Sequence, residues 1–105
     1  MITVTFTEKG QKLSLRLEGH AGYAEEGQDI VCASASILAY TLASIVDTFG
    51  YEVKPNISME SGNAFIECEC IDGMTLNKVA DAFFYAKRGY ALLQQNYPQY
   101  VRLMP

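Results

Sequence analysis

Hydrophobic and polar positions alternate in two runs near the start of the chain. Residues 2–7 place Ile, Val and Phe between threonines, and residues 13–18 place leucines between polar residues. Alternation of period two with β-branched residues is typical of strands that bury one face. The polar segment Glu8–Gln11 between the runs contains a glycine, which suits a tight turn. The two runs therefore predict an antiparallel hairpin.

A nearly uncharged stretch from Ile30 to about Phe49 predicts a long helix. Asp29 is placed to cap its first turn, because a carboxylate there can accept hydrogen bonds from unpaired backbone amides. Gly50 is placed to end the helix. The uncharged run Ile30–Val46 contains serines and a threonine and is shorter than the roughly 20 apolar residues of a membrane span. We therefore expect a buried or dimer-facing helix and no membrane anchor.

The second half of the chain repeats this order of elements. Pro55–Met59 and Ala64–Ile71 predict a second hairpin with its turn at Ser61–Asn63. A second helix is expected to begin near Gly73–Thr75 and to end before Pro98, because the residue before a proline disfavours the helical conformation. Its apolar positions recur every three or four residues, at Leu76, Val79, Ala80, Phe83, Tyr90 and Leu93.

The elements together predict the fold class. Residues 100–103 are expected to add a short edge strand. The order β-β-α-β-β-α then indicates an α+β fold in which two helices pack on a mainly antiparallel sheet. No linker, internal repeat or low-complexity tract interrupts residues 1–105, so we expect a single domain.

Composition narrows the class of protein. Half of the 105 residues are hydrophobic and 19% are charged, which is typical of a globular chain. The net charge of −4 leaves no general basic surface for nucleic acid and weakly favours a basic partner. Met1–Thr7 alternates like a strand and lacks the basic and apolar blocks of a signal peptide. We therefore expect a cytoplasmic protein whose three cysteines are free thiols.

His20 and Cys32 are the candidate reactive pair. His20 is the single histidine of the chain, and Cys32 falls at the third helical position if Asp29 is the cap. A thiol with an ordinary pKa of about 8.5 is only about 3% thiolate at pH 7. The partial positive charge of a helix N-terminus and a nearby imidazole would both raise that fraction. The unpaired amides of the same turn could hold an oxyanion after attack on a carbonyl.

Simpler interpretations compete with these candidates. A lone cysteine near a helix start is usually a small buried side chain, and a lone histidine at a strand end usually lies near the surface. Cys68 and Cys70, two apart on one strand, are interpreted as core thiols. Their spacing and the single histidine offer too few ligands for zinc, so we expect no metal and no cofactor. Tyr85, Tyr90 and Tyr97 are interpreted as packing residues.

A glycine-rich loop, residues 19–28, joins the first hairpin to the first helix and contains Gly19, Gly22 and Gly27. The glycines would let a substrate strand approach closely and would let the histidine fold back toward the cysteine. We expect this loop to be poorly ordered alone and to close over a bound peptide.

Several side chains near the pair have open roles. For Asp29, a helix cap or a substrate contact is favoured over a third catalytic member that orients the histidine. Ser34 and Ser36, in the first helical turns, suit tight helix packing and substrate binding equally. Glu25 and Glu26 border the expected cleft and would help to recruit a basic substrate.

The join between hairpin and helix carries an ordered motif. It reads Gly19-His20-Ala21-Gly22, then a short loop with a further glycine, then Asp29-Ile30-Val31-Cys32-Ala33. This motif resembles the signature of the ribosomal-processing cysteine protease family, the Prp or YsxB-like proteins. The resemblance covers the whole chain, since members of that family are small and share the β-β-α-β-β-α layout. The core motif shows no departure from the family pattern.

The resemblance implies roles that the residues alone do not establish. It places the catalytic histidine and cysteine of the family on His20 and Cys32, with Asp29 and Ser36 as supporting positions. It further implies a homodimer that removes the short N-terminal extension of a large-subunit ribosomal protein, the twenty-seventh, a cut needed for ribosome function. A different class of function stays open. The chain could be a non-enzymatic dimeric module, for peptide binding or ribosome assembly, that holds a peptide with the same glycine loop.

Overall fold

Two β-hairpins, each leading into a long helix, make up most of the computed structural model, which describes residues 1–105. The first hairpin pairs β1 (Ile2–Lys9) with β2 (Lys12–Glu18). The glycine-rich loop follows and leads into α1 (Ile30–Thr48). The first half of the chain therefore has the elements that its hydrophobic pattern predicts.

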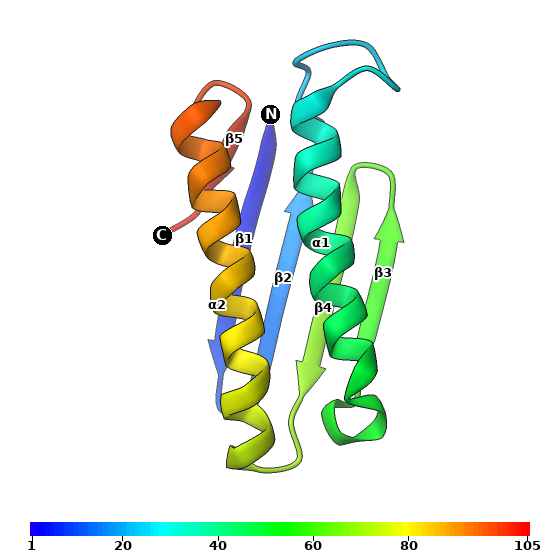
Figure 1. Cartoon of the computed structure of the whole chain (residues 1–105), viewed down its shortest axis with the longest axis vertical. Helices are drawn as coiled ribbons and strands as arrows, with labels where there is room; N and C mark the ends of the chain where they lie inside the picture. The colour runs from blue at the N-terminus through cyan, green and yellow to red at the C-terminus, as the bar shows by residue number, and fades with distance from the viewer.

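The second hairpin pairs β3 (Asn56–Glu60) with β4 (Asn63–Glu69), and α2 (Gly73–Asn96) follows it. A short final strand, β5 (Val101–Leu103), lies at one edge of the sheet. The predicted α+β order β-β-α-β-β-α is confirmed, and Figure 1 shows both helices running along the strands.

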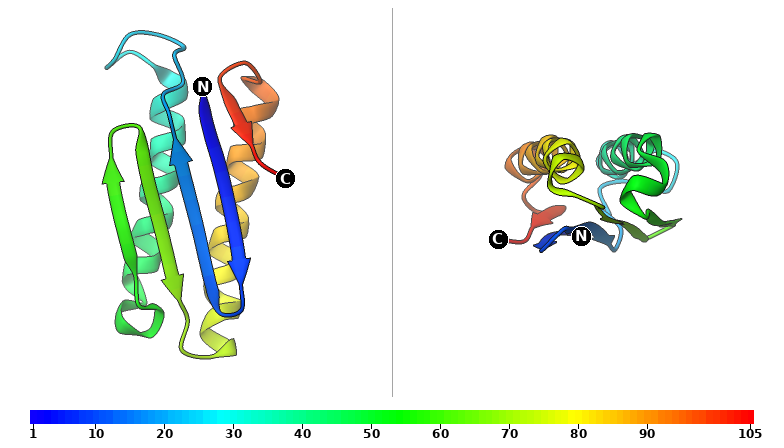
Figure 2. Two further views of the ribbon diagram at one scale, coloured as in Figure 1. Left: turned by 180° about the vertical axis from the view of Figure 1, so that it is seen from behind. Right: turned by 90° about the horizontal axis from the view of Figure 1, so that it is seen from below.

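The five strands form one sheet in the order β3-β4-β2-β1-β5. All neighbours are antiparallel except β1 and β5, which run parallel, so the sheet is mixed but mainly antiparallel. Both helices cover the same face of this sheet and form the second of two layers (Figure 2). Because β2 lies beside β4, the end of β2 at Glu18 meets Asn63, directly after the β3–β4 turn.

The core lies between the sheet and the two helices. Alternate positions of the strands, one face of each long helix and the turn after α1 supply its largest fully buried side chains: Val4, Leu15, Val31, Leu42, Val46, Val53, Ile66, Cys68, Val79, Tyr90 and Val101. The hydroxyl of Tyr90 on α2 donates a hydrogen bond of 2.8 Å to the carbonyl oxygen of Ala35 on α1. The two helices are therefore joined by a buried hydrogen bond as well as by apolar contact.

The second hairpin differs in detail from the prediction. β4 ends at Glu69, because the partner strand β2 begins opposite that residue, and Ile71 lies beyond the ladder. Asn63 belongs to β4, so the turn holds only Ser61–Gly62, as two-residue hairpin turns commonly do. The sequence pattern also does not predict η1, a 3-10 helix over Gly50–Val53 that directly follows the end of α1.

The surfaces of the two helices correct one packing prediction. Tyr85 on α2 is 70% exposed, so its interpretation as a packing residue is wrong, whereas Tyr90 is buried. On α1, Ile37 and Tyr40 are also exposed, although the opposite face of that helix packs in the core. By length and composition alone α1 could cross a membrane, with a mean hydropathy of 1.7, but core helices of soluble proteins pass the same test.

Candidate active site

Asp29 fixes the first turn of α1 and ties part of the loop to it. One carboxylate oxygen accepts hydrogen bonds from the backbone amides of Val31, at 3.0 Å, and Cys32, at 2.9 Å. The other accepts from the amides of Tyr23, at 2.9 Å, and Ala24, at 3.3 Å. Desolvation acts to raise the pKa of Asp29, but these four donors together outweigh it and hold the pKa below its ordinary value.

This geometry bears on one of the roles considered for Asp29, and a contact with substrate stays a prediction. Its side chain is the helix cap that the sequence predicts, and no hydrogen bond joins it to His20. The expectation that first-turn amides hold an oxyanion does not fit this structure for Val31 and Cys32. Both amides already donate to the cap, so they are not free to bind a substrate oxygen.

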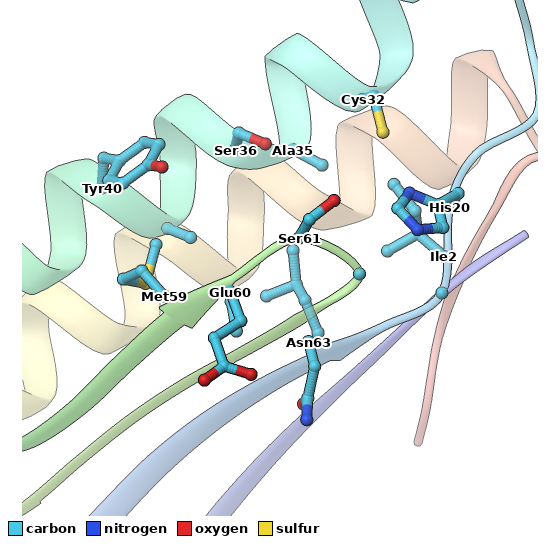
Figure 3. Close-up of a pocket in the computed structure, with 15 residues that line it drawn as sticks. Ile2, His20, Cys32, Ala35, Ser36, Tyr40, Met59, Glu60, Ser61 and Asn63 are labelled. Atoms are coloured by element: carbon cyan, nitrogen blue, oxygen red, sulfur yellow. The ribbon is translucent and has the colours of Figure 1, made fainter. Parts of the chain in front are cut away.

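A pocket of about 290 Å³ separates α1 from the β3–β4 hairpin and contains both members of the candidate pair. Figure 3 shows the sulfur of Cys32 pointing from α1 toward the imidazole of His20. No hydrogen bond joins the two side chains in this structure. Ala39, Tyr40 and Met59 supply apolar surface to the pocket, and Glu60, Ser61 and Asn63 supply polar groups.

A second hollow, of about 670 Å³, opens beside the glycine-rich loop. Gly22, Gly27 and Asp29 lie in its wall, together with Glu26. The two hollows share four lining side chains, namely His20, Cys32, Ser36 and Ser61. A peptide that runs from one hollow into the other would therefore pass directly over the thiol and the imidazole.

Ser34 and Ser36, both on α1, differ in their contacts. The hydroxyl of Ser34 donates to the carbonyl of Ile30 at 2.7 Å and lines neither hollow, so Ser34 serves the helix. Ser36 lines both hollows and no protein group accepts a hydrogen bond from its hydroxyl. Its position thus keeps a substrate contact possible.

The β3–β4 turn forms a wall of the site that sequence reasoning missed. Ser61 and Gly62 line the pocket, and Figure 3 shows the Ser61 side chain reaching up toward α1. The carbonyl of Gly62 accepts a hydrogen bond of 2.9 Å from the amide of Gly19, the residue before His20. The sequence predicts this turn but carries no signal for its place, which depends on β2 pairing with β4.

The loop has anchors of its own. The ring of Tyr23 meets the rings of Tyr97 and Tyr100 edge to face, with centroids 5.5 Å and 5.2 Å away. At its start, Gly19 has a φ of +94° and its Cα lies against the carbonyl of Met1, so no side chain fits there. Poor order of the free loop stays a prediction, and these contacts are what a moving loop would have to break.

The three cysteines are free and lie in different surroundings. Cys68 and Cys70 are buried, which confirms the core interpretation, and burial raises the pKa of both thiols, that of Cys68 to about 12. Cys32 is only partly buried and faces the pocket. No group of three or more His, Cys, Asp or Glu side chains is placed to hold a metal ion.

Cys32 is the only one of the three thiols that lines an open groove together with the imidazole of His20. A thiol on the first turn of a helix, with an imidazole across an open groove, is an arrangement that suits a cysteine peptidase. Comparison with known proteins leads to the same class. The sequence model of the family described as cysteine protease Prp matches residues 1–102, and the chain belongs to this family.

Individual relatives agree with that assignment. The chain is 31% identical over 70 residues to the ribosomal processing cysteine protease Prp of Bacillus subtilis, a match that spans 64% of this chain and 62% of that protein. Among solved structures, SMU.848 from Streptococcus mutans is 30% identical, with a TM-score of 0.70 over 98% of this chain and 91% of that one. The Staphylococcus aureus Prp, crystallised with a covalently linked product peptide, has a TM-score of 0.79 at 23% identity, covering 98% and 97%, and shares the fold.

Proposed function

We propose that the chain is a cysteine endopeptidase in which Cys32 is the nucleophile and His20 the general base. The observation that carries the proposal is the meeting of two hollows at these two side chains. A peptide lying in both hollows would present one of its bonds to the Cys32 sulfur. Membership of the cysteine protease Prp family supports the same role.

The reaction follows from the chemistry of the pair. His20 accepts the thiol proton as the Cys32 sulfur attacks the carbonyl carbon of the scissile bond. His20 then donates that proton to the leaving amine, and the C–N bond breaks to leave a thioester. Water, deprotonated by His20, attacks the thioester, which releases the acid product and restores the thiol.

We propose that the substrate is the N-terminal extension of a large-subunit ribosomal protein, the twenty-seventh. The Bacillus subtilis relative is a ribosomal processing protease. Ala39, Tyr40 and Met59 in the first pocket suit apolar side chains of an extension, and Glu26 beside the second hollow suits the basic character of ribosomal proteins. Within this proposal Asp29, Ser36 and the loop glycines Gly19, Gly22 and Gly27 support substrate binding. The protein would act in the cytoplasm as a homodimer, without cofactor, metal or direct nucleic-acid contact.

The direct test uses a synthetic peptide that contains the extension and the residues that follow it. Mass spectrometry would follow its cleavage by the wild-type chain, Cys32→Ser and His20→Ala, with circular dichroism to verify folding. We expect no cleavage by Cys32→Ser and a loss of about 10²- to 10⁴-fold in rate for His20→Ala, the usual contribution of a general base. Binding of the peptide by the wild type without any cleavage would reject the peptidase and favour the non-enzymatic dimeric module.

A further inference from the structure

The imidazole of His20 has no hydrogen-bonding partner that orients it. In a serine or cysteine triad a carboxylate or amide holds the histidine ring by a hydrogen bond. Here both carboxylate oxygens of Asp29 accept from backbone amides, and no other side chain bonds to the ring. A base must nevertheless be held within reach of the proton it takes. His20 is exposed, so the few contacts that its ring makes with the rest of the fold are the means by which it can be positioned.

The β3–β4 turn meets the ring directly. A Cβ atom at Gly62 would lie 2.7 Å from Nε2, 3.2 Å from Cε1 and 3.4 Å from Cδ2 of His20. Real Cβ atoms essentially never approach other heavy atoms below 3.0 Å, so the imidazole occupies space that only glycine leaves open. Gly62 also has a φ of +76°, in the left-handed region that favours glycine.

The turn is well placed to act as a fixed support. Asn63, the next residue, pairs with Glu60 on β3 and with Glu18 on β2, so the turn sits at the end of two ladders. The carbonyl of Gly62 accepts from the amide of Gly19, which ties the turn to the backbone that carries the histidine. The ring and the surface beneath it are thus anchored to the same strands.

We propose that Gly62 is a positioning residue, whose bare backbone holds the His20 imidazole in the orientation needed for proton exchange with Cys32. This inference rests on the proposed role of His20 as general base. Packing against a glycine here takes the place of the hydrogen bond from a third residue. A side chain at position 62 would meet the far end of the exposed His20 side chain and push the ring out of this orientation.

The test compares Gly62→Ala with Gly10→Ala. Gly10 lies in the two-residue turn of the first hairpin at a φ of +62°, and nothing lies within 4 Å of a Cβ placed there. Both substitutions impose the same kind of backbone strain, but only the first meets the imidazole. We expect Gly62→Ala to lower kcat/KM by about 10- to 100-fold, because misplacement by about 1 Å can cost that much. The loss should fall on kcat, with KM changed less than about twofold, and Gly10→Ala should match the wild type.

A second readout follows the ring itself. His20 is the only histidine, so its Cε1–H signal in a ¹H–¹³C NMR spectrum reports this imidazole alone. We expect Gly62→Ala to shift this signal, and Gly10→Ala to leave it unchanged. Should Gly62→Ala fail to fold, Gly62→Asn tests the same clash, because asparagine tolerates the left-handed backbone but keeps the Cβ.

The outcomes separate this inference from the proposed function. Cleavage that survives His20→Ala unchanged rejects the general-base role, and this inference with it. The other outcome is that His20→Ala loses cleavage, whereas Gly62→Ala and Gly10→Ala cleave equally and the histidine signal does not move. This outcome rejects the positioning role of Gly62 and leaves the role of His20 standing.

Discussion

Replacing Asp29 with alanine tests whether this carboxylate acts as a structural cap or as a catalytic partner. The change removes the acceptor of the Val31 and Cys32 amides and releases the loop amides of Tyr23 and Ala24. Loss of an N-cap of this kind costs about 1–2 kcal/mol in the free energy of unfolding. For a domain of this size each kcal/mol corresponds to a fall in Tm of about 4–8 °C.

Asp72→Ala supplies the matched control. Asp72 caps α2 by accepting from the Thr75 amide at 2.8 Å, but it tethers no loop and does not line the site. Both variants should unfold more easily. Only Asp29→Ala should speed hydrogen exchange in residues 22–28 and weaken peptide cleavage, with a loss smaller than that of His20→Ala. A loss as large as that of His20→Ala, in a chain that still folds, would show that Asp29 takes part in catalysis.

The pH dependence of the free energy of unfolding independently measures how much the Asp29 carboxylate stabilises the fold. The pKa of Asp29 in the folded chain lies below its ordinary value of 3.8, so the charged form is the one that folding favours. Its stabilising contribution is therefore complete above the ordinary pKa and is lost as the pH falls through the folded pKa. Chemical denaturation measures the free energy of unfolding of the wild type and of Asp29→Ala. The difference between the two free energies should be constant from about pH 7 to pH 5 and should become smaller below about pH 4. A difference that does not narrow in acid would refute the cap as its source.

Two further predictions concern the core. Tyr90→Phe removes the buried hydrogen bond to Ala35 and should lower the free energy of unfolding in urea by about 1 kcal/mol. Peptide cleavage should stay unchanged, because Tyr90 does not line the pocket and Ala35, which does, keeps its own side chain; a drop in kcat/KM would show that this hydrogen bond also shapes the pocket. Iodoacetamide at pH 8 should modify the native chain once, at Cys32, as judged by mass spectrometry. Burial and the raised pKa protect Cys68 and Cys70, and prompt alkylation of either would show that the core opens readily.

The sequence predicts the strands and helices of this fold well, but it does not predict which strands pair with one another. Alternation at Ile2 and Val4, the carboxylate at Asp29 and the glycine at Gly50 are local signals, and local signals set where strands and helices begin and end. The parallel pairing of β5 with β1 and the order of the five strands depend on contacts between distant segments. Periodicity carries no information about those contacts.

The sequence also predicts one side of the candidate site and misses the other. His20 and Cys32 stand out because they flank one loop within a family motif. Ser61 and Gly62, which form the opposite wall, lie far along the chain and look like any hairpin turn. Their place appears only once β4 is known to pair with β2. The sequence also suggests that the first-turn amides of α1 bind an oxyanion. Asp29, the residue that predicts the helix start, accepts the hydrogen bonds of the Val31 and Cys32 amides, so those two are not free to do so.

The aromatic contacts of Tyr23 have a consequence for synthesis on the ribosome. The loop beside His20 rests on Tyr97 and Tyr100, and the carbonyl of Tyr100 also accepts the amide of Ile2 at the start of β1. These partners are translated long after the loop, so a nascent chain that carries both thiol and imidazole still lacks the support that holds them. The contacts of the Tyr23 ring can form only after residues 97–100 have left the exit tunnel. The candidate site therefore gains this support only after most of the domain has been translated.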